Sequence, residues 1–317
     1  MNKKLKSVNI EKTLFFDIEV VRKSKILDIN SREFELYQKK TRNKETDEFL
    51  SDDDAVMDYH KRAALKMGYT KIVSIGVGFV KGGEVHIKAI DEGTEEEIIK
   101  QFCIIAQSFE YISGANILGY DLPMIVNNGF KYFDVSEILP DSFVPSGKKP
   151  WNLDKVLDLM DIFRGTHYIN NSVDELCYHF DIPSPKTELD GSKVSDEYWN
   201  NGVTKISEYV KQDVFANVNI FRKMRFEPIF KSFIDKNDFK VQEVPLLEKL
   251  YKNNYLSDEI KVEFERTLKK KKPTVKDKTN LRNILVGVYV ISEFMKSDDK
   301  DTVARKHNEI DEFLKTI

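Results

Sequence analysis

The sequence predicts an α/β domain followed by a small helical one. Strand-like apolar runs alternate with amphipathic helical patterns over the first 230 residues, which is the order of elements in an α/β fold. From residue 235 onward the chain changes to Lys- and Glu-rich helical patterns, with one further strand candidate at residues 286–291. We therefore expect two domains, residues 1–230 and residues 231–317.

The composition favours a soluble intracellular protein. Hydrophobic residues make up 41% of the 317 residues, enough for a sizeable core. The two cysteines, Cys103 and Cys177, lie in apolar contexts without a C-x-x-C pattern, so we expect reduced, buried thiols and no zinc site. The longest apolar run, residues 284–291, is too short to span a bilayer. We expect a cytoplasmic protein without a membrane partner.

The charge balance limits how a nucleic acid could be held. The formal net charge is -3, so local basic residues or metal ions, and not a global positive field, would have to attract phosphates. One dense basic block is present, at Lys269, Lys270, Lys271 and Lys272. Two interpretations stay open for it: a solvated helix end and linker, or a surface that binds a nucleic-acid strand.

Residues 14–21 predict the central strand of the first domain. Six of these eight residues are apolar, aromatic or β-branched, which is typical of a strand covered on both faces. Asp17 and Glu19 interrupt the run at a spacing of two, so both carboxylates leave the strand on the same side. Two such charges about 4 Å apart repel by about 4 kcal/mol at an effective dielectric near 20. A divalent metal between them resolves this repulsion; an edge strand with both acids in water is the alternative.

The elements up to residue 115 follow from spacing and turn signals. Residues 22–54 are charged and give no strong pattern, and residues 55–67 keep helical spacing after three aspartates. Residues 72–80 and 84–90 predict two strands joined by a tight hairpin at Gly82-Gly83. An amphipathic helix at 95–107 and a short strand at 111–115 follow.

The second half of the domain carries four further aspartates of interest in helical or strand-like contexts. A helix is expected from about Pro123 to residues 128–129, with Asp121 as its N-cap in the simplest interpretation. Residues 156–163 predict a strand in which Asp158 and Asp161 are structural or peripheral, residues 173–180 a helix, and residues 184–202 mostly loop. Residues 204–224 give the clearest helix, where Tyr209 and Asp213 share one face beside the apolar stripe. A solvent-facing Tyr–Asp pair is the alternative there.

The order of these groups resembles the three exonuclease motifs of the DEDD superfamily. The motifs are Phe16-Asp17-Ile18-Glu19, residues 114–123 (Gly-Ala-Asn-Ile-Leu-Gly-Tyr-Asp-Leu-Pro), and Tyr209-Val-Lys-Gln-Asp213. The last motif resembles the Tyr subtype, as in the proofreading domain of B-family DNA polymerases, and residues 159–161 and 189–194 are similar to stand-alone exonucleases related to that domain. The resemblance covers about residues 10–225. Tyr120 where Phe is usual, Met124 where an aromatic is common and the insertion at 22–54 depart from the pattern, but every carboxylate is kept.

The resemblance implies a ribonuclease-H-like fold, a mixed five-stranded sheet flanked by helices, and a two-metal 3′→5′ exonuclease. Such an enzyme hydrolyses single-stranded DNA ends to 5′-mononucleotides in replication or repair. By resemblance, Asp17 bridges two Mg²⁺ or Mn²⁺ ions, Glu19 and Asp213 complete the ion that activates water, Asp121 acts on the second ion, and Tyr209 orients the water.

Substrate and partners follow less directly. Asn116 and Tyr120 are candidates for gripping the terminal nucleotide, by hydrogen bond and stacking, and the lysines at 269–272 for holding the strand. RNA is an alternative substrate, because discrimination depends on a contact to the 2′-hydroxyl that the sequence does not locate. A non-enzymatic alternative is a binding module whose metal site is retired. It would serve a replicative polymerase or other replication protein through the C-terminal helices. The four intact acids argue against it.

Overall fold

One mixed sheet organises the part of the chain that the structure, a computed structural model, describes: residues 3–42, 48–145, 153–165, 171–185, 189 and 191–235. The strands run in the order β5-β4-β1-β2-β3-β6. Their bounds are β1 Thr13–Arg22, β2 Thr70–Lys81, β3 Glu84–Ile90, β4 Tyr111–Gly114, β5 Val156–Asp158 and β6 Ile234–Asp235. β2 pairs with β1 and with β3 in antiparallel fashion, whereas the β1–β4, β4–β5 and β3–β6 pairs are parallel.

β1 lies in the interior of this sheet, between β4 and β2. Its burial is continuous except at Asp17, as expected for a strand covered on both faces. The expected α/β fold with a mixed sheet is therefore confirmed, and the edge-strand alternative for the two acids is wrong. A sixth strand, the two-residue β6, is added to the five expected.

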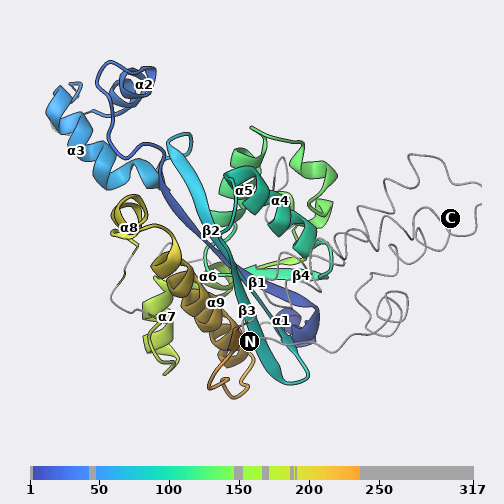
Figure 1. The fold of residues 1–317 in the computed structure, drawn as a ribbon. Coiled ribbons are helices and arrows are strands. Elements are labelled where there is room, and N and C mark those ends of the chain that lie inside the picture. The colour runs from blue at the N-terminus through green and yellow to red at the C-terminus, as the bar shows by residue number, and fades with distance from the viewer. Residues whose placement is uncertain are drawn as a thin grey trace, which may run out of the picture.

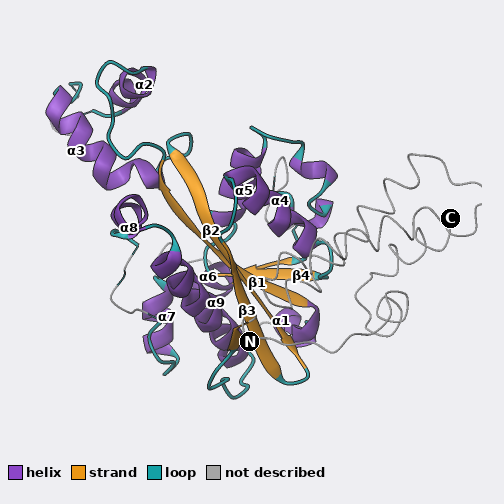
Figure 2. Cartoon of the chain, in the orientation of Figure 1, coloured by secondary structure: helices purple, strands orange, loops and turns teal. Residues whose placement is uncertain are grey.

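Helices cover both faces of the sheet (Figures 1 and 2). On one face, α4 (Glu95–Ala106) and α5 (Asp121–Gly129) bury a core that includes Leu14, Phe16 and Ile18 of β1. On the other face, α9 (Thr204–Met224) and α7 (Val173–His179) pack on Phe15. Alternate residues of β1 thus face different helices, which places Asp17 and Glu19 on the α9 side.

A β-bulge follows Glu19 in β1. Glu19 stands opposite Ser74 of β2, but the next residue, Val20, stands opposite Ile72, so one residue of β2 is extra. The amide N–H of Ile72 donates instead to the carboxylate of Glu95, the first residue of α4, at 2.8 Å. Bulges increase local twist and re-aim side chains, so this one bends the β1–β2 ladder directly beyond the two acids.

The connection between β1 and β2 forms a small helical insertion. Helices α2 (Arg32–Lys40) and α3 (Asp52–Arg62) lie beyond the end of the sheet in Figure 1, and α8 (Val194–Asn201) lies between α3 and α9 in this view. Their own buried cluster includes Tyr37, Tyr59 and Tyr69, whose rings pack edge to face around Tyr37. The expected helix at 55–67 is confirmed in part, since α3 begins earlier, at Asp52, where the side chain of Ser51 caps it.

Two secondary-structure predictions are wrong. The expected strand at 156–163 stops at Asp158, because the Asp158 side chain caps the short helix α6 (Leu159–Arg164) that begins there. The expected loop at 184–202 contains α8. The hairpin strands, α4, α7 and the full length of α9 are confirmed.

The remaining predictions are partly confirmed and partly open. Cys103 and Cys177 are buried free thiols, as expected. Apart from residues 231–235, the expected second domain lies outside the described residues, as do the strand at 286–291 and the basic block, so the domain division stays a prediction. Among the described helices, none combines the length and apolar character that crossing a membrane requires.

Candidate active site

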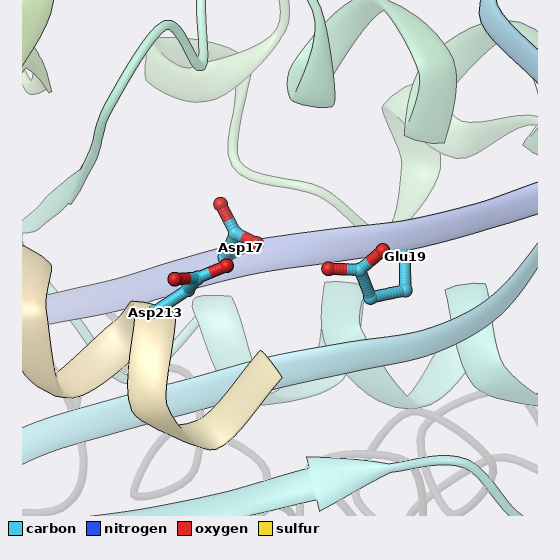
Figure 3. A group of neighbouring side chains, drawn as sticks. All are labelled: Asp17, Glu19 and Asp213. Atoms are coloured by element: carbon cyan, nitrogen blue, oxygen red, sulfur yellow. The ribbon is translucent and has the colours of Figure 1, made fainter. Parts of the chain in front are cut away.

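β1 and α9 bring three carboxylates together on one face of the sheet. Asp17 and Glu19 extend from β1 toward α9, and Asp213 extends from α9 toward them (Figure 3). One carboxylate oxygen from each residue lies within 4.8 Å of the other two. Glu19 and Asp213 are each 8% exposed, whereas Phe16 and Ile18 point to the opposite face and are buried in the core. The predicted convergence of the first and last motifs is therefore present.

Asp121 approaches the same strand from the side of β4. It is the first residue of α5, is 4% exposed, and accepts a hydrogen bond from the backbone N–H of Ile18 at 3.1 Å. β4 pairs with β1 only at Thr13–Phe15, so the Ile18 N–H finds its acceptor in the Asp121 carboxylate. The N-cap interpretation of Asp121 is thus wrong, since Tyr120 occupies the cap position. Asp121 does not belong to the group within 4.8 Å, but its charge acts on both Asp17 and Glu19.

Burial and mutual repulsion raise the pKa values of these acids. The pKa of Asp17 lies well above its usual range, first because of burial and then because of the charges of Asp121, Asp213 and Glu19. The pKa of Glu19 is raised by burial and by Asp213 and Asp121. Burial raises the pKa of Asp121 to about 8, although the hydrogen bond from Ile18 opposes the shift. Each charged neighbour that shifts Asp17 and Glu19 is therefore another acid.

These residues fit a divalent cation by their chemistry. Carboxylate oxygens are the ligands that Mg²⁺ and Mn²⁺ prefer, and a cation among them offsets the repulsion that raises their pKa values. A second observation points the same way: the buried hydroxyl of Ser74, directly opposite Glu19 in the ladder, has no hydrogen-bond partner within the described residues. Water carried by a hydrated ion beside Glu19 would supply one.

Tyr209 stands one helical turn before Asp213 and is buried with it. The ring, 8% exposed, packs with Val21, Ile206 and Val194, and the hydroxyl hydrogen-bonds the carboxylate of Asp213. Burial, followed by the charge of Asp213, raises the pKa of Tyr209 far above its usual range. The solvent-facing alternative for this pair is wrong. Tyr209 is therefore a protonated donor held against a candidate metal ligand.

A comparison with protein families assigns the chain to a family. A family model described as "Predicted 3'-5' exonuclease related to the exonuclease domain of PolB" matches residues 62–265. The chain belongs to this family. The match contains Asp121, Tyr209 and Asp213, while Asp17 and Glu19 precede it and join Asp213 through the fold. No curated protein matches the chain.

In this member of the PolB-related exonuclease family, the two candidates for contacting a nucleotide lie on the loop before Asp121. Asn116 adopts a left-handed backbone (φ 60°) and its side chain lies against Gly119, where an added Cβ would be 2.4 Å from the Asn116 Oδ1. The Tyr120 hydroxyl donates to the carbonyl of Ala64, at the base of the helical insertion, at 3.0 Å. Tyr120 therefore links the loop to the insertion, and nucleotide contacts of both residues stay predictions. Lys269, Lys270, Lys271 and Lys272 lie outside the described residues.

Sequence reasoning missed the helix that supports Tyr209. Val194 of α8 packs in the same cluster as Tyr209, and α8 is tied to the end of β1 through Arg22. The Arg22 guanidinium lies 2.8 Å from the Asp196 carboxylate, and the Arg22 carbonyl accepts from the Trp199 indole at 3.2 Å. The signals were the four-residue spacing of Val194 and Tyr198 and the glycine at 202, which ends α8.

Proposed function

We propose that the protein is a metal-dependent 3′→5′ exonuclease that hydrolyses single-stranded DNA ends to 5′-mononucleotides. One observation carries the proposal: three carboxylates from β1 and α9, of which Glu19 and Asp213 are buried and Asp17 is partly buried, lie within 4.8 Å of one another in a chain of the PolB-related exonuclease family. Buried acids in this arrangement are costly without a cation. Phosphodiester hydrolysis is the chemistry of the family and uses such cations.

Each acid has a distinct position for this task. Asp17, Glu19 and Asp213 would together hold one ion, and Asp121, which approaches β1 from the side of β4, would contribute to a second. When bound, Mg²⁺ or Mn²⁺ ions lower the pKa of water and stabilise charge on the attacking and leaving oxygens. The fold fixes the acids beforehand, because Asp17 and Glu19 sit on an interior strand and Asp121 is tied to the backbone of Ile18.

Tyr209 orients the attacking water in this scheme. Its hydroxyl already lies at the Asp213 carboxylate, and its raised pKa keeps the phenol protonated at neutral pH. A protonated phenol donates a hydrogen bond and does not act as a base, so Tyr209 positions the water without taking its proton. Asn116 and Tyr120, on the loop that leads into Asp121, would contact the terminal nucleotide.

We further propose a role in DNA replication or repair in the cytoplasm, with a replicative polymerase or other replication protein as partner; the support for the replication role is the relation of the family to the PolB exonuclease domain. The test is a time course on 5′-labelled single-stranded DNA and RNA with Mg²⁺, Mn²⁺ or EDTA. We expect a ladder of DNA shortened from the 3′ end, release of 5′-mononucleotides, and no product in EDTA. Faster degradation of RNA would change the substrate to RNA. If the protein binds the DNA or RNA strand but cleaves it with neither Mg²⁺ nor Mn²⁺, the exonuclease proposal is wrong and the protein is a binding module with a retired metal site.

A further inference from the structure

The carboxylate of Asp158 accepts four backbone hydrogen bonds in the interior of the domain. Asp158 is the last residue of β5 and is 2% exposed. Its Oδ1 accepts from the N–H groups of Asn116 at 2.9 Å, Met160 at 3.0 Å and Asp161 at 3.2 Å, and its Oδ2 accepts from Leu118 at 2.9 Å. These bonds join two segments that are 40 or more residues apart in the sequence.

Only two of the four bonds serve the helix that Asp158 begins. The bonds from Met160 and Asp161 cap α6, which is the ordinary role of an aspartate in this position. The bonds from Asn116 and Leu118 hold the loop that leaves β4. β4 and β5 are parallel neighbours with Gly114 opposite Asp158, so both strands end at the same edge of the sheet. The loop bonds are therefore additional to capping.

The backbone of the loop that follows β4 is constrained, and the Asp158 carboxylate stabilises it. At Gly114 it leaves the sheet so close to β1 that an added Cβ would lie 2.5 Å from the carbonyl oxygen of Phe16. Two residues later Asn116 adopts φ 60°, a conformation that L-residues other than glycine adopt at a cost. The Asp158 carboxylate accepts from the N–H of Asn116 and from that of Leu118. The backbone torsions ψ of Asn116 and φ and ψ of Ile117 lie between these two N–H groups, so the two bonds together restrain them. One side chain thus fixes the path of the strained turn.

The turn leads directly into the second metal-binding candidate. The N–H of Tyr120 donates to the carbonyl of Asn116 at 3.0 Å, and the N–H of Leu122 donates to that of Ile117 at 2.9 Å. Asp121 lies between these two donors and reaches Ile18 of β1. A shift of the turn would therefore move Asp121 relative to Asp17, whereas Glu19 and Asp213 are carried by β1 and α9, which Asp158 does not hydrogen-bond.

We propose that Asp158 is a positioning residue, which holds the loop of residues 115–120 and, through it, sets the place of Asp121 and of the Asn116 and Tyr120 side chains. This inference rests on the proposed function. It gives a specific role to a residue that the sequence placed only as structural or peripheral. A carboxylate is required, because an amide at this position keeps one acceptor and turns an N–H₂ donor toward one of the backbone N–H groups.

Two substitutions separate the loop from the helix cap. Asp158→Ser retains a good N-cap for α6 but is too short to reach both loop N–H groups. Asp158→Asn keeps the size of the side chain and loses one acceptor. The matched control is Asp161→Asn, three residues away, whose carboxylate pairs with Arg164 and does not contact the loop. It removes the same charge from the same helix.

Three measurements then report on the loop, the metal and the reaction. In metal-free protein, hydrogen exchange of the peptide covering residues 115–121 should become at least about 10-fold faster in Asp158→Ser and Asp158→Asn. Turnover on single-stranded DNA should fall about 10–100-fold, the usual effect of an outer-shell change at a metal site. Calorimetry should show the tighter Mn²⁺ site unchanged and a weaker one further weakened. Asp161→Asn should match the wild type in all three.

The outcomes are distinct from those of the proposed function. An inactive wild-type protein would refute the exonuclease, yet the exchange and Mn²⁺ measurements would still decide the role of Asp158. Unchanged loop exchange, or a uniform loss of both Mn²⁺ sites together with a lowered unfolding midpoint in both variants, would overturn the inference and leave Asp158 as a helix cap. If Asp158→Ser does not fold, Asp158→Asn alone decides, because its Oδ1 still accepts at α6.

Discussion

Gly76 lies directly opposite Asp17 in the β1–β2 ladder, and helix α9 fills the space where a side chain at position 76 would stand. A Cβ added there would lie 2.8 Å from the Cγ2 of Val214 and 3.0 Å from the Cγ2 and the carbonyl oxygen of Val210. Both valines flank Asp213 on α9. The absence of a side chain at Gly76 therefore determines how closely Asp213 approaches Asp17.

Gly76→Ala should accordingly damage both stability and the metal site. The backbone of α9 must move to admit the methyl group, and overpacking of this kind costs about 1–3 kcal/mol. Because Asp213 moves with α9, Mn²⁺ affinity should fall as well. Urea unfolding and calorimetry measure the two effects. Gly191→Ala is the control, since nothing lies within 4 Å of an added Cβ at that turn. Wild-type Mn²⁺ affinity in a destabilised Gly76→Ala would contradict the link between packing and site.

Removing Asp17 should abolish activity without unfolding the protein. Asp17 is the acid whose pKa is raised by all three of the others, so it stands in the middle of the acidic group. Asp17→Ala should lower nuclease turnover by several orders of magnitude. In EDTA its melting temperature should rise slightly, because one of four mutually repelling acids has been removed. Turnover close to that of the wild type would refute the catalytic role of Asp17.

The metal-free protein should lose stability as the pH rises. The pKa of Asp121 is 3.8 in an unfolded reference and about 8 in the fold, and those of Asp17 and Glu19 are also raised. Between about pH 4 and pH 8 the folded state therefore binds more protons than the unfolded state, so the free energy of unfolding falls with increasing pH. Melting temperatures measured in EDTA across this range should decline, and saturating Mg²⁺ should reduce the decline.

The same titration of Asp17→Ala is the internal control. Removal of Asp17 eliminates one of the shifted acids and one source of repulsion for the rest, so its slope should be shallower than that of the wild type. Equal slopes in the two proteins would mean that other groups cause the pH dependence.

Tyr209 should affect turnover but not metal binding. Tyr209→Phe removes only the hydroxyl that lies against Asp213 and leaves the packing with Val21 and Ile206 intact. Loss of a water-orienting group should lower turnover about 10²–10⁴-fold. Calorimetry should show an unchanged Mn²⁺ affinity. Weaker Mn²⁺ binding would instead place the hydroxyl among the groups that hold the ion.

The sequence predicts the parts of this fold that have a strong local period. The sequence predicts β1 from a nearly continuous apolar run, the hairpin at Gly82 and Gly83 from its turn residues, and all of α9 from a four-residue stripe. α6 and α8 escape prediction because they are short, and α8 is polar apart from Val194 and a Tyr-Trp pair. Their stability comes from tertiary contacts, such as those of Arg22 with α8, which no local pattern records.

The residues of the candidate site also divide into those that local spacing predicts and those that depend on tertiary contacts. A spacing of two on a buried strand and of four on a helix places Asp17, Glu19 and Asp213 correctly, because both periods fix direction as well as position. Asp121 required more, since its partner is the Ile18 N–H, 103 residues earlier, left available where β4 ends. The sequence left the role of Asp158 unspecified, as structural or peripheral, for the same reason: its loop bonds depend on strand order, which the sequence alone does not supply.

The remaining prediction concerns the positive charge that would hold the nucleic-acid strand away from the cleavage site. Four acids repel the phosphates that the site must cut, and bound cations offset this only at the scissile bond. With a net charge of -3, further attraction has to be local. Residues 266–282, outside the described part of the chain, contain eight Lys or Arg residues and one acid, Asp277. This stretch is the densest source of positive charge in the sequence, and we propose that it tracks the strand.

Replacing Lys269, Lys270, Lys271 and Lys272 together by Gln tests this role. Each lost phosphate contact reduces the salt slope of single-strand binding by about 0.7, so the quadruple variant should flatten the slope by up to ~3. Its KM on long strands should rise, because those strands reach the block. Cleavage of very short oligonucleotides should stay unchanged, since they occupy only the carboxylate site. A wild-type salt slope in the quadruple variant would show that these lysines are a solvated linker, because a residue that neutralises a phosphate must release counterions when the strand binds.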